Sequence, residues 1–78
     1  MPKVTIYTTT SCVFCKMTKE FFKEHNVVYE EKNAAADPAA RDELIQKSGQ
    51  LGVPVIDVEG KIIVGFDEPA LKEALRIQ

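Results

Sequence analysis

The sequence predicts an α/β fold in which three helices flank a four-stranded mixed sheet, in the order β-α-β-α-β-β-α. Short runs rich in β-branched and aromatic residues alternate with segments of helical periodicity. An Asp followed within two positions by Pro marks the start of two helices, and a Glu-Gly pair joins the last two strands. Because the chain has 78 residues, 45% of them hydrophobic, we expect one domain over residues 1–78.

The first half of the chain is expected to form a strand, a helix and a second strand. Residues 3–8 are rich in β-formers and favour a strand. From Val13 to Glu24, apolar residues recur at the spacing of an α-helix. His25 and Asn26 end this helix, with Asn26 suited to the left-handed conformation that often closes helices. Val27–Glu31 follows as a strand. The residues that show the helical spacing are Phe14, Met17 and Phe21.

The second helix is marked at both ends. Asp37 is expected to be its N-cap, because an aspartate side chain accepts hydrogen bonds from the free N–H groups of the first turn. Pro38 suits the first helical position, and Gly49 ends the helix. Within it, Glu43 and Lys47 are four residues apart and are expected to form an ion pair.

A hairpin and a closing helix are expected to complete the fold. Val53–Val58 and Lys61–Val64 are two β-rich runs, and the short connection Glu59-Gly60 joins them. Asp67 is expected to cap the last helix. Two residues that flank this cap are expected to pack on each other as a hydrophobic staple, Phe66 and Leu71.

Charge and hydropathy exclude several classes of function. The net charge of −2 argues against nucleic-acid binding, whose affinity rests mainly on phosphates neutralised by basic residues. No apolar run approaches the ~20 residues that a membrane-spanning helix needs. Met1-Pro2-Lys3 leads directly into a strand instead of an apolar secretory segment, so we expect a cytoplasmic protein. We also expect the protein to be a monomer. Residues 1–23 carry a net charge of +3 and the rest of the chain −5.

Two cysteines, Cys12 and Cys15, carry the candidate chemistry, and four roles can be compared. As a structural staple, a disulfide that closes about four residues would contribute only ~2 kcal/mol. Zinc needs four ligands, and the one histidine, His25, lies roughly 15 Å further along the helix. The same distance removes His25 as the base of a cysteine hydrolase. A metal ion or Fe–S cluster that bridges two subunits stays open as an alternative, and we expect no metal site within one chain.

A redox-active dithiol fits the pair best. Thr10 or Ser11 is expected to cap the helix, which places Cys12 at the helix N-terminus, where free N–H groups and the helix dipole favour a thiolate. Lys16 lies one turn further on and adds to this positive field. We therefore expect Cys12 to attack a disulfide and Cys15 to resolve the mixed disulfide that forms.

Four motifs together make the sequence resemble a glutaredoxin, a member of the thioredoxin-fold superfamily. They occur in the expected order and at the expected separations over essentially the whole chain. They are Ile6-Tyr7-Thr8, Cys12-Val13-Phe14-Cys15, Gly52-Val53-Pro54 and Val64-Gly65-Phe66-Asp67.

The resemblance implies roles for residues outside the cysteine pair. It implies a cis peptide bond between Val53 and Pro54, and a Val53 backbone that pairs with glutathione or with a substrate peptide. It implies that the corner formed by Gly65, Phe66 and Asp67 receives the γ-glutamyl end of glutathione. We expect no tightly bound cofactor, with glutathione as a possible co-substrate.

Three departures from the family pattern weaken the case for glutathione. Val13-Phe14 stands where many glutaredoxins have Pro-Tyr, Thr9 where they often carry a lysine, and Val64 where they have a glycine. The Val after the first cysteine, the single Gly-Phe pair and the Pro shortly after it are similar to the NrdH-type redoxins, which take electrons from thioredoxin reductase and pass them to ribonucleotide reductase. Asp67-Glu68 is glutaredoxin-like. We expect an electron donor that reduces protein or glutathione mixed disulfides, with the reductant left open.

Overall fold

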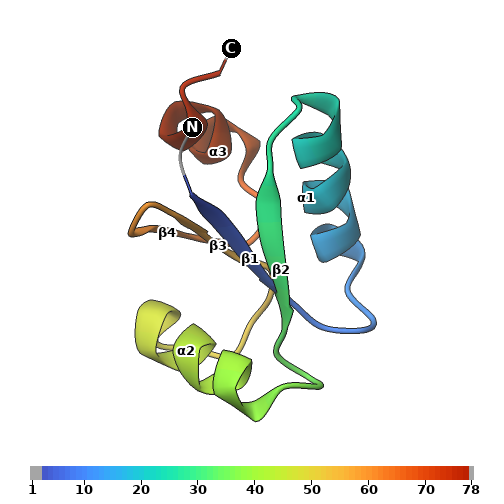
Figure 1. Ribbon diagram of the computed structural model, residues 1–78, viewed down its shortest axis with the longest axis vertical. Helices are drawn as coiled ribbons and strands as arrows, with labels where there is room; N and C mark the ends of the chain where they lie inside the picture. Colours follow the sequence, from blue (N-terminus) through green and yellow to red (C-terminus); the bar gives the residue numbers. More distant parts are fainter. Residues whose placement is uncertain (1–2, 78) are drawn as a thin grey trace.

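Strands and helices follow one another in the predicted order in the computed structural model, which describes residues 3–77 (Figure 1). Within these residues no helix is long and apolar enough to cross a membrane. The helices are α1 (Val13–Glu24), α2 (Pro38–Ser48) and α3 (Glu68–Leu75); the strands are β1 (Val4–Thr8), β2 (Tyr29–Asn33), β3 (Val55–Val58) and β4 (Lys61–Val64).

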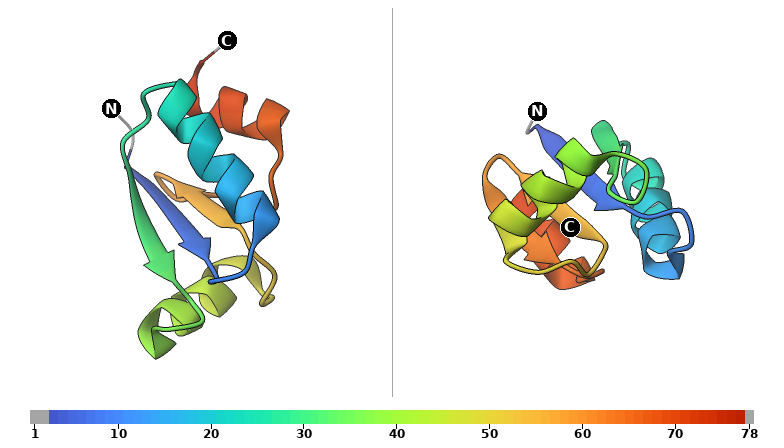
Figure 2. Two further views of the ribbon diagram at one scale, coloured as in Figure 1. Left: turned by 90° about the vertical axis from the view of Figure 1, so that its right-hand side faces the viewer. Right: turned by 90° about the horizontal axis from the view of Figure 1, so that it is seen from below.

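The strands form one mixed sheet in the order β2-β1-β3-β4. β1 and β2 run parallel and are connected through α1, whereas β3 is antiparallel to both of its neighbours, β1 and β4. α1 and α3 cover one face of the sheet, and α2 crosses the other (Figures 1 and 2). The predicted fold class, a four-stranded mixed sheet flanked by three helices, is confirmed.

Alternate residues of β1 and β3 contribute to two hydrophobic cores, because successive side chains of a strand point to opposite faces. Ile6 and Ile56 are fully buried in the core beneath α1 and α3. On the other face, Tyr7 and Val55 pack with Leu44 of α2 and are also fully buried. Burial of each such side chain contributes about 1.5–3 kcal/mol, so the two central strands stabilise both layers of helices.

β2 begins at Tyr29, two residues later than predicted, and it ends at Asn33. The delay arises because the chain is still closing α1. Asn26 is left-handed, with φ 56°, and the Val27 N–H donates to the Phe22 C=O at 2.8 Å. This is a Schellman closure, and it confirms that Asn26 ends the helix.

β3 also begins later than predicted, at Val55 instead of Val53. Pro54 precedes it and has no N–H to donate to the ladder. β1 begins at Val4, one residue after the predicted start, and β4 has the predicted bounds.

α1 spans the predicted residues, but its buried face differs from the apolar stripe that predicted the helix. The Phe14 side chain is 58% exposed and that of Met17 is 41% exposed. The face toward the sheet lies one position further along and includes a polar residue, Thr18, whose hydroxyl donates to the Phe14 C=O at 2.8 Å. The buried residues of α1 are Cys15, Thr18, Phe21 and Phe22.

The predicted caps of α2 and α3 and the predicted hairpin turn are confirmed by their hydrogen bonds and dihedral angles. An Oδ1 atom of Asp37 accepts the N–H two residues on at 3.0 Å, and that of Asp67 accepts the N–H three residues on at 3.2 Å. Gly49 ends α2 in the left-handed conformation, with φ 73°. Glu59 and Gly60 both have positive φ, as a tight hairpin turn between twisted strands requires.

The hydroxyl group of Tyr7 joins α2 to the sheet. It donates to Glu43 Oε1 at 2.9 Å and accepts from Lys47 Nζ at 2.8 Å. The predicted ion pair between Glu43 and Lys47 is wrong, because each reaches a strand instead: Glu43 pairs with Lys32 at 3.0 Å, and Lys47 pairs with Asp57 at 2.6 Å. The bonds to Asp57 and Tyr7 raise the pKa of Lys47 above its ordinary value.

Substitution Tyr7→Phe should destabilise the protein by about 1 kcal/mol, because it removes one buried hydroxyl that makes two hydrogen bonds. Urea unfolding at neutral pH measures this free energy. Tyr29→Phe is the matched control, since within residues 3–77 the Tyr29 hydroxyl makes no hydrogen bond, and it should change the free energy little. Equal losses in the two variants would contradict the role of the Tyr7 hydroxyl.

Candidate functional site

Three connecting segments meet at one end of the sheet, and strand register explains why. β3 is antiparallel to β1 with Val55 opposite Tyr7. The loop that leads into β3 therefore lies beside the loop that follows β1. Val64 of β4 lies opposite Val55 in turn, and the Gly65 N–H donates to the Pro54 C=O at 2.8 Å. This end of the sheet therefore gathers the three segments that the sequence singles out: 12–15, 53–54 and 65–67.

The two cysteines lie at the start of α1, where they form a disulfide. Their Cα atoms are 5.2 Å apart, within the usual range for such a bond. Cys12 is half-buried, whereas Cys15 is 2% exposed. Cys12 is therefore the more accessible of the two residues to a large substrate, whereas Cys15 lies on the buried face of the helix.

Cys12 is itself the N-cap of α1, so the prediction that Thr10 or Ser11 would cap the helix is wrong. Its backbone is extended, and its Sγ accepts the N–H of Cys15 at 3.0 Å. Ser11 is exposed and makes no side-chain hydrogen bond within residues 3–77, while Thr10 Oγ1 lies 3.5 Å from Asn33 Nδ2. The Cys12 sulfur thus occupies the position at which a capping oxygen is usual.

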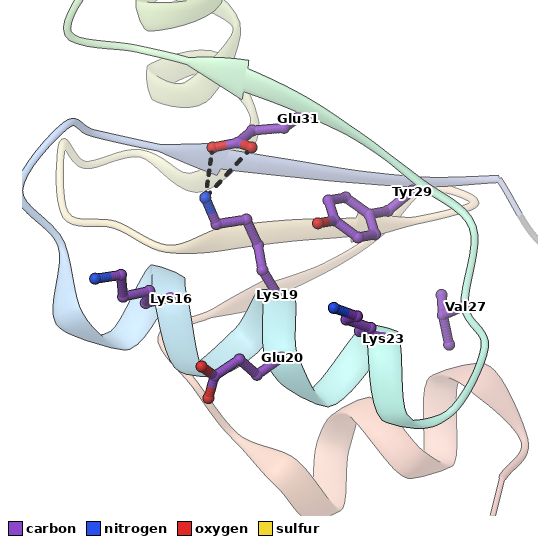
Figure 3. A pocket seen from close by; sticks show the side chains of 7 residues that line it. All are labelled: Lys16, Lys19, Glu20, Lys23, Val27, Tyr29 and Glu31. Carbon is purple, nitrogen blue, oxygen red and sulfur yellow. Dashed lines mark hydrogen bonds and ion pairs between the residues drawn. The ribbon is translucent and has the colours of Figure 1, made fainter.

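The electrostatic field at this position is positive. The first turn of α1 contains no acidic residue, and its free N–H groups carry the positive end of the helix dipole. Lys16 is exposed, and its side chain extends along α1 toward the start of the helix (Figure 3). Such a site stabilises a thiolate over a thiol.

A hydrogen-bond chain that the sequence analysis missed ties β1, β2 and α1 together beside this site. Buried Thr8, the last residue of β1, donates its hydroxyl to Glu31 Oε2 at 2.8 Å, and Lys19 of α1 pairs with the same oxygen at 3.1 Å. The Thr8 bond, more than those of Lys19, lowers the pKa of Glu31. The parallel pairing of β1 and β2 was the available signal, because it puts Thr8 and Glu31 on one face as diagonal neighbours.

The Val53–Pro54 peptide bond is cis, as the resemblance implies. Pro54 is buried, and Val53 is partly buried against the core beneath α2. Within residues 3–77, neither the N–H nor the C=O of Val53 makes a hydrogen bond. A donor and an acceptor are therefore free at the end of the sheet that holds the cysteines.

Exposed apolar side chains surround the same end of the sheet. Val13 and Phe14, between the cysteines, are 72% and 58% exposed. Leu51, in the loop before β3, and Val64, at the end of β4, are each 53% exposed. We call these four residues the apolar rim. Leu51 was not among the predicted site residues, since nothing local in the sequence marks it.

Gly65, Phe66 and Asp67 form the corner between β4 and α3. Gly65 has φ 82°, a conformation that side chains disfavour. Phe66 is partly buried against the larger core, to which the fully buried Leu71 also belongs, and its ring centroid lies 6.1 Å from that of Phe21. Asp67 caps α3, so its carboxylate already has a backbone partner.

His25 lies at the opposite end of α1 from the cysteines and takes no part in the site. It is half-buried, and its ring centroid lies 4.4 Å from that of Phe21. Among residues 3–77, no group of three or more His, Cys, Asp or Glu side chains is placed to hold a metal ion.

Comparisons with known proteins point to the same chemistry. The glutaredoxin family model matches residues 4–63. A glutaredoxin-like 8.6 kDa protein in the rubredoxin operon of Clostridium pasteurianum is 40% identical over 72 residues, which cover 92% of this chain and 96% of that protein. Glutaredoxin 3 of Escherichia coli is 32% identical over 68 residues, or 87% and 82% of the two chains.

Solved structures agree with the fold. The thioredoxin-like protein BC3987 superposes with a TM-score of 0.87 at 33% identity, covering 92% of this chain and 99% of its own. A glutaredoxin from Archaeoglobus fulgidus superposes with a TM-score of 0.85 at 30% identity, covering 97% and 88% of the two chains.

Substitution Thr8→Val should raise the pKa of Glu31 toward its ordinary value of 4.5, because the carboxylate loses its main hydrogen-bond donor. A carboxyl NMR titration measures this shift. Since the folded pKa lies below the unfolded one, the bond stabilises the fold above about pH 4.5, and its contribution is lost as pH falls through the folded value. Thr9→Val is the control and should leave the Glu31 titration unchanged; a matching shift there would refute the assignment.

Proposed function

Because the chain belongs to the glutaredoxin family, whose general chemistry is thiol–disulfide exchange, we propose that it reduces disulfides with Cys12 as nucleophile and Cys15 as resolving thiol. The observation that carries this proposal is the position of the Cys12 sulfur, partly exposed and at the N-cap of α1. We further propose that residues 1–78 act as one domain, as a cytoplasmic monomer with no tightly bound cofactor.

The reaction proceeds in two exchanges. In the first, the Cys12 thiolate attacks one sulfur of the substrate disulfide, and the other sulfur leaves as a thiolate that takes up a proton. In the second, Cys15 loses its proton and attacks the Cys12 sulfur, which releases the remaining half of the substrate as a thiolate that also takes up a proton. The substrate gains two electrons and two protons overall, and the protein is left with the Cys12–Cys15 disulfide.

The difference in exposure between the two cysteines supports these two proposed roles. A substrate with bulk on both sides of its disulfide reaches Cys12, at the tip of the helix, more easily than Cys15, which is 2% exposed. Cys15 needs access only to the adjacent Cys12 sulfur. Lys16, together with the helix start near Ser11, supplies the positive field that favours the attacking thiolate.

The substrate backbone is proposed to pair with Val53. Its unbonded N–H and C=O can accept an extended peptide as an added strand, with Pro54 fixing the loop behind it. The corner at Gly65 allows close approach of a chain on the other side. Phe66 supports that corner from the core, and Asp67 holds it at the start of α3.

Protein disulfides are the proposed substrate class. The apolar rim offers contact area to a polypeptide, whereas glutathione, an anion, needs cationic or N–H partners. The segments 12–15, 53–54 and 65–67 contain no lysine or arginine, and Asp67-Glu68 at the corner before α3 is acidic. Ribonucleotide reductase is a candidate target, and glutathione or thioredoxin reductase regenerates the dithiol.

Substitution Cys12→Ser should lower disulfide reductase activity roughly a thousandfold or more, because the nucleophile is lost. Cys15→Ser should retain the first exchange and accumulate a one-to-one mixed disulfide with the substrate. Mass spectrometry of the non-reduced products separates the two outcomes. Reductase activity in Cys12→Ser close to that of the wild type would exclude the proposed mechanism.

The reductant is identified by recycling the oxidised protein in two parallel assays. One supplies glutathione with glutathione reductase and NADPH, and the other supplies thioredoxin reductase with NADPH. Because the segments 12–15, 53–54 and 65–67 contain no lysine or arginine to bind the carboxylates of glutathione, and because the apolar rim is exposed, we expect the second assay to give faster NADPH consumption. Faster recycling by glutathione would instead identify glutathione as the reductant.

A further inference from the structure

A groove of about 410 Å³ runs along α1 on the side that faces β2. Its walls come from the exposed side of α1 and from the edge strand β2 (Figure 3). It begins beside the active-site helix start and continues away from it. The residues that line it are Lys16, Lys19, Glu20, Lys23, Val27, Tyr29 and Glu31.

Two lysines of this groove lack ion-pair partners. Lys19 is paired with Glu31, but within residues 3–77 neither Lys16 nor Lys23 lies in an ion pair. Glu20, the other acidic residue of the lining, also lies in no ion pair within the described residues, and its side chain points away from that of Lys19 (Figure 3). The groove therefore presents more free positive than free negative charge.

The groove also contains a free polar group between its lysines. The Tyr29 hydroxyl points into the groove toward Lys19 and Lys23 (Figure 3). It makes no hydrogen bond within residues 3–77, so it can donate to an incoming carboxylate. A phenolic O–H beside ammonium groups suits an anion.

The charge distribution of the whole chain favours approach from this side. Residues 1–23 carry a net charge of +3, whereas residues 24–78 carry −5. An acidic partner is repelled by most of the surface and attracted to the part that contains α1. Such asymmetry steers the orientation of an encounter and raises its rate.

We propose that this groove, which we call the lysine groove, docks an acidic polypeptide segment that flanks the disulfide of the substrate protein. This inference rests on the proposed function, because Lys16 lies one turn from Cys12 and connects the groove to the reacting sulfur. The rise from Lys16 to Lys23 is about 10 Å, which matches roughly three residues of extended chain. Three acidic side chains near the cysteine of the substrate therefore have a place to bind.

The test uses three short synthetic peptides, each as a disulfide-linked homodimer. The residues that flank the cysteine include three Asp in the first peptide, three Ser in the second and three Lys in the third. At about 0.01 M ionic strength, where charges interact over ~30 Å, kcat/KM for the Asp peptide should exceed that for the Ser peptide roughly 3- to 10-fold. The Lys peptide should be the poorest substrate. At about 1 M salt, where screening acts over ~3 Å, the three values should converge.

Lys23→Glu probes the lysine groove without touching the proposed catalytic residues, and it should remove most of the Asp-peptide advantage, with Lys23→Gln intermediate. Lys61→Glu is the matched control: it makes the same change of net charge at an exposed position on β4, the opposite edge of the sheet, and should keep the advantage. Unfolding midpoints verify that each variant is folded.

An equal effect of Lys61→Glu and Lys23→Glu, or no preference for the Asp peptide in the wild type, would overturn the lysine groove as a docking site. Reduction of the Ser peptide reports separately on the disulfide chemistry. If the wild type fails to reduce the Ser peptide at any ionic strength, it is the proposed function that fails.

Discussion

The antiparallel insertion of β3 between β1 and β4 is the constraint on which the rest of the structure depends. It brings the end of β1, the start of β3 and the end of β4 to one end of the sheet, so three loops that are far apart in the chain become neighbours. The single hydrogen bond from the Gly65 N–H to the Pro54 C=O continues this pairing beyond the strands. The cysteine pair, the cis-proline loop and the corner before α3 are therefore placed by backbone pairing, with no need for direct contacts among their side chains.

Local signals explain what the sequence predicts well. Asp37, Asp67, Gly49 and the Glu59-Gly60 turn act through their own backbone neighbours, and each behaves as expected. The order of strands and helices follows from the same short-range patterns. The position of the cysteine pair at a helix start is likewise visible in the sequence, because it needs only the strand before it and the helix after it.

Predictions that depend on tertiary partners were less accurate. Glu43 and Lys47 lie one helical turn apart, but each forms an ion pair with a residue of a strand. The buried hydroxyl of Tyr7 lies between them and forms a hydrogen bond with both. The hydrophobicity of a residue does not show whether it lies in the core or at an exposed site. Phe14 therefore contributed to the apolar pattern that predicted the helix, although its side chain is exposed in the apolar rim. The capping role of Cys12 could not be inferred from residue preferences, since sulfur is an unusual N-cap acceptor.

That capping role gives the protein an internal reporter of its own chemical state. The Cys15 N–H donates to the Cys12 sulfur, with 3.0 Å between nitrogen and sulfur. The resonance of that amide, observed in an isotope-labelled sample, should respond to the electron density on the sulfur. We expect it to differ between the disulfide and the dithiol, so that turnover can be followed from a single backbone group without dyes or alkylating reagents.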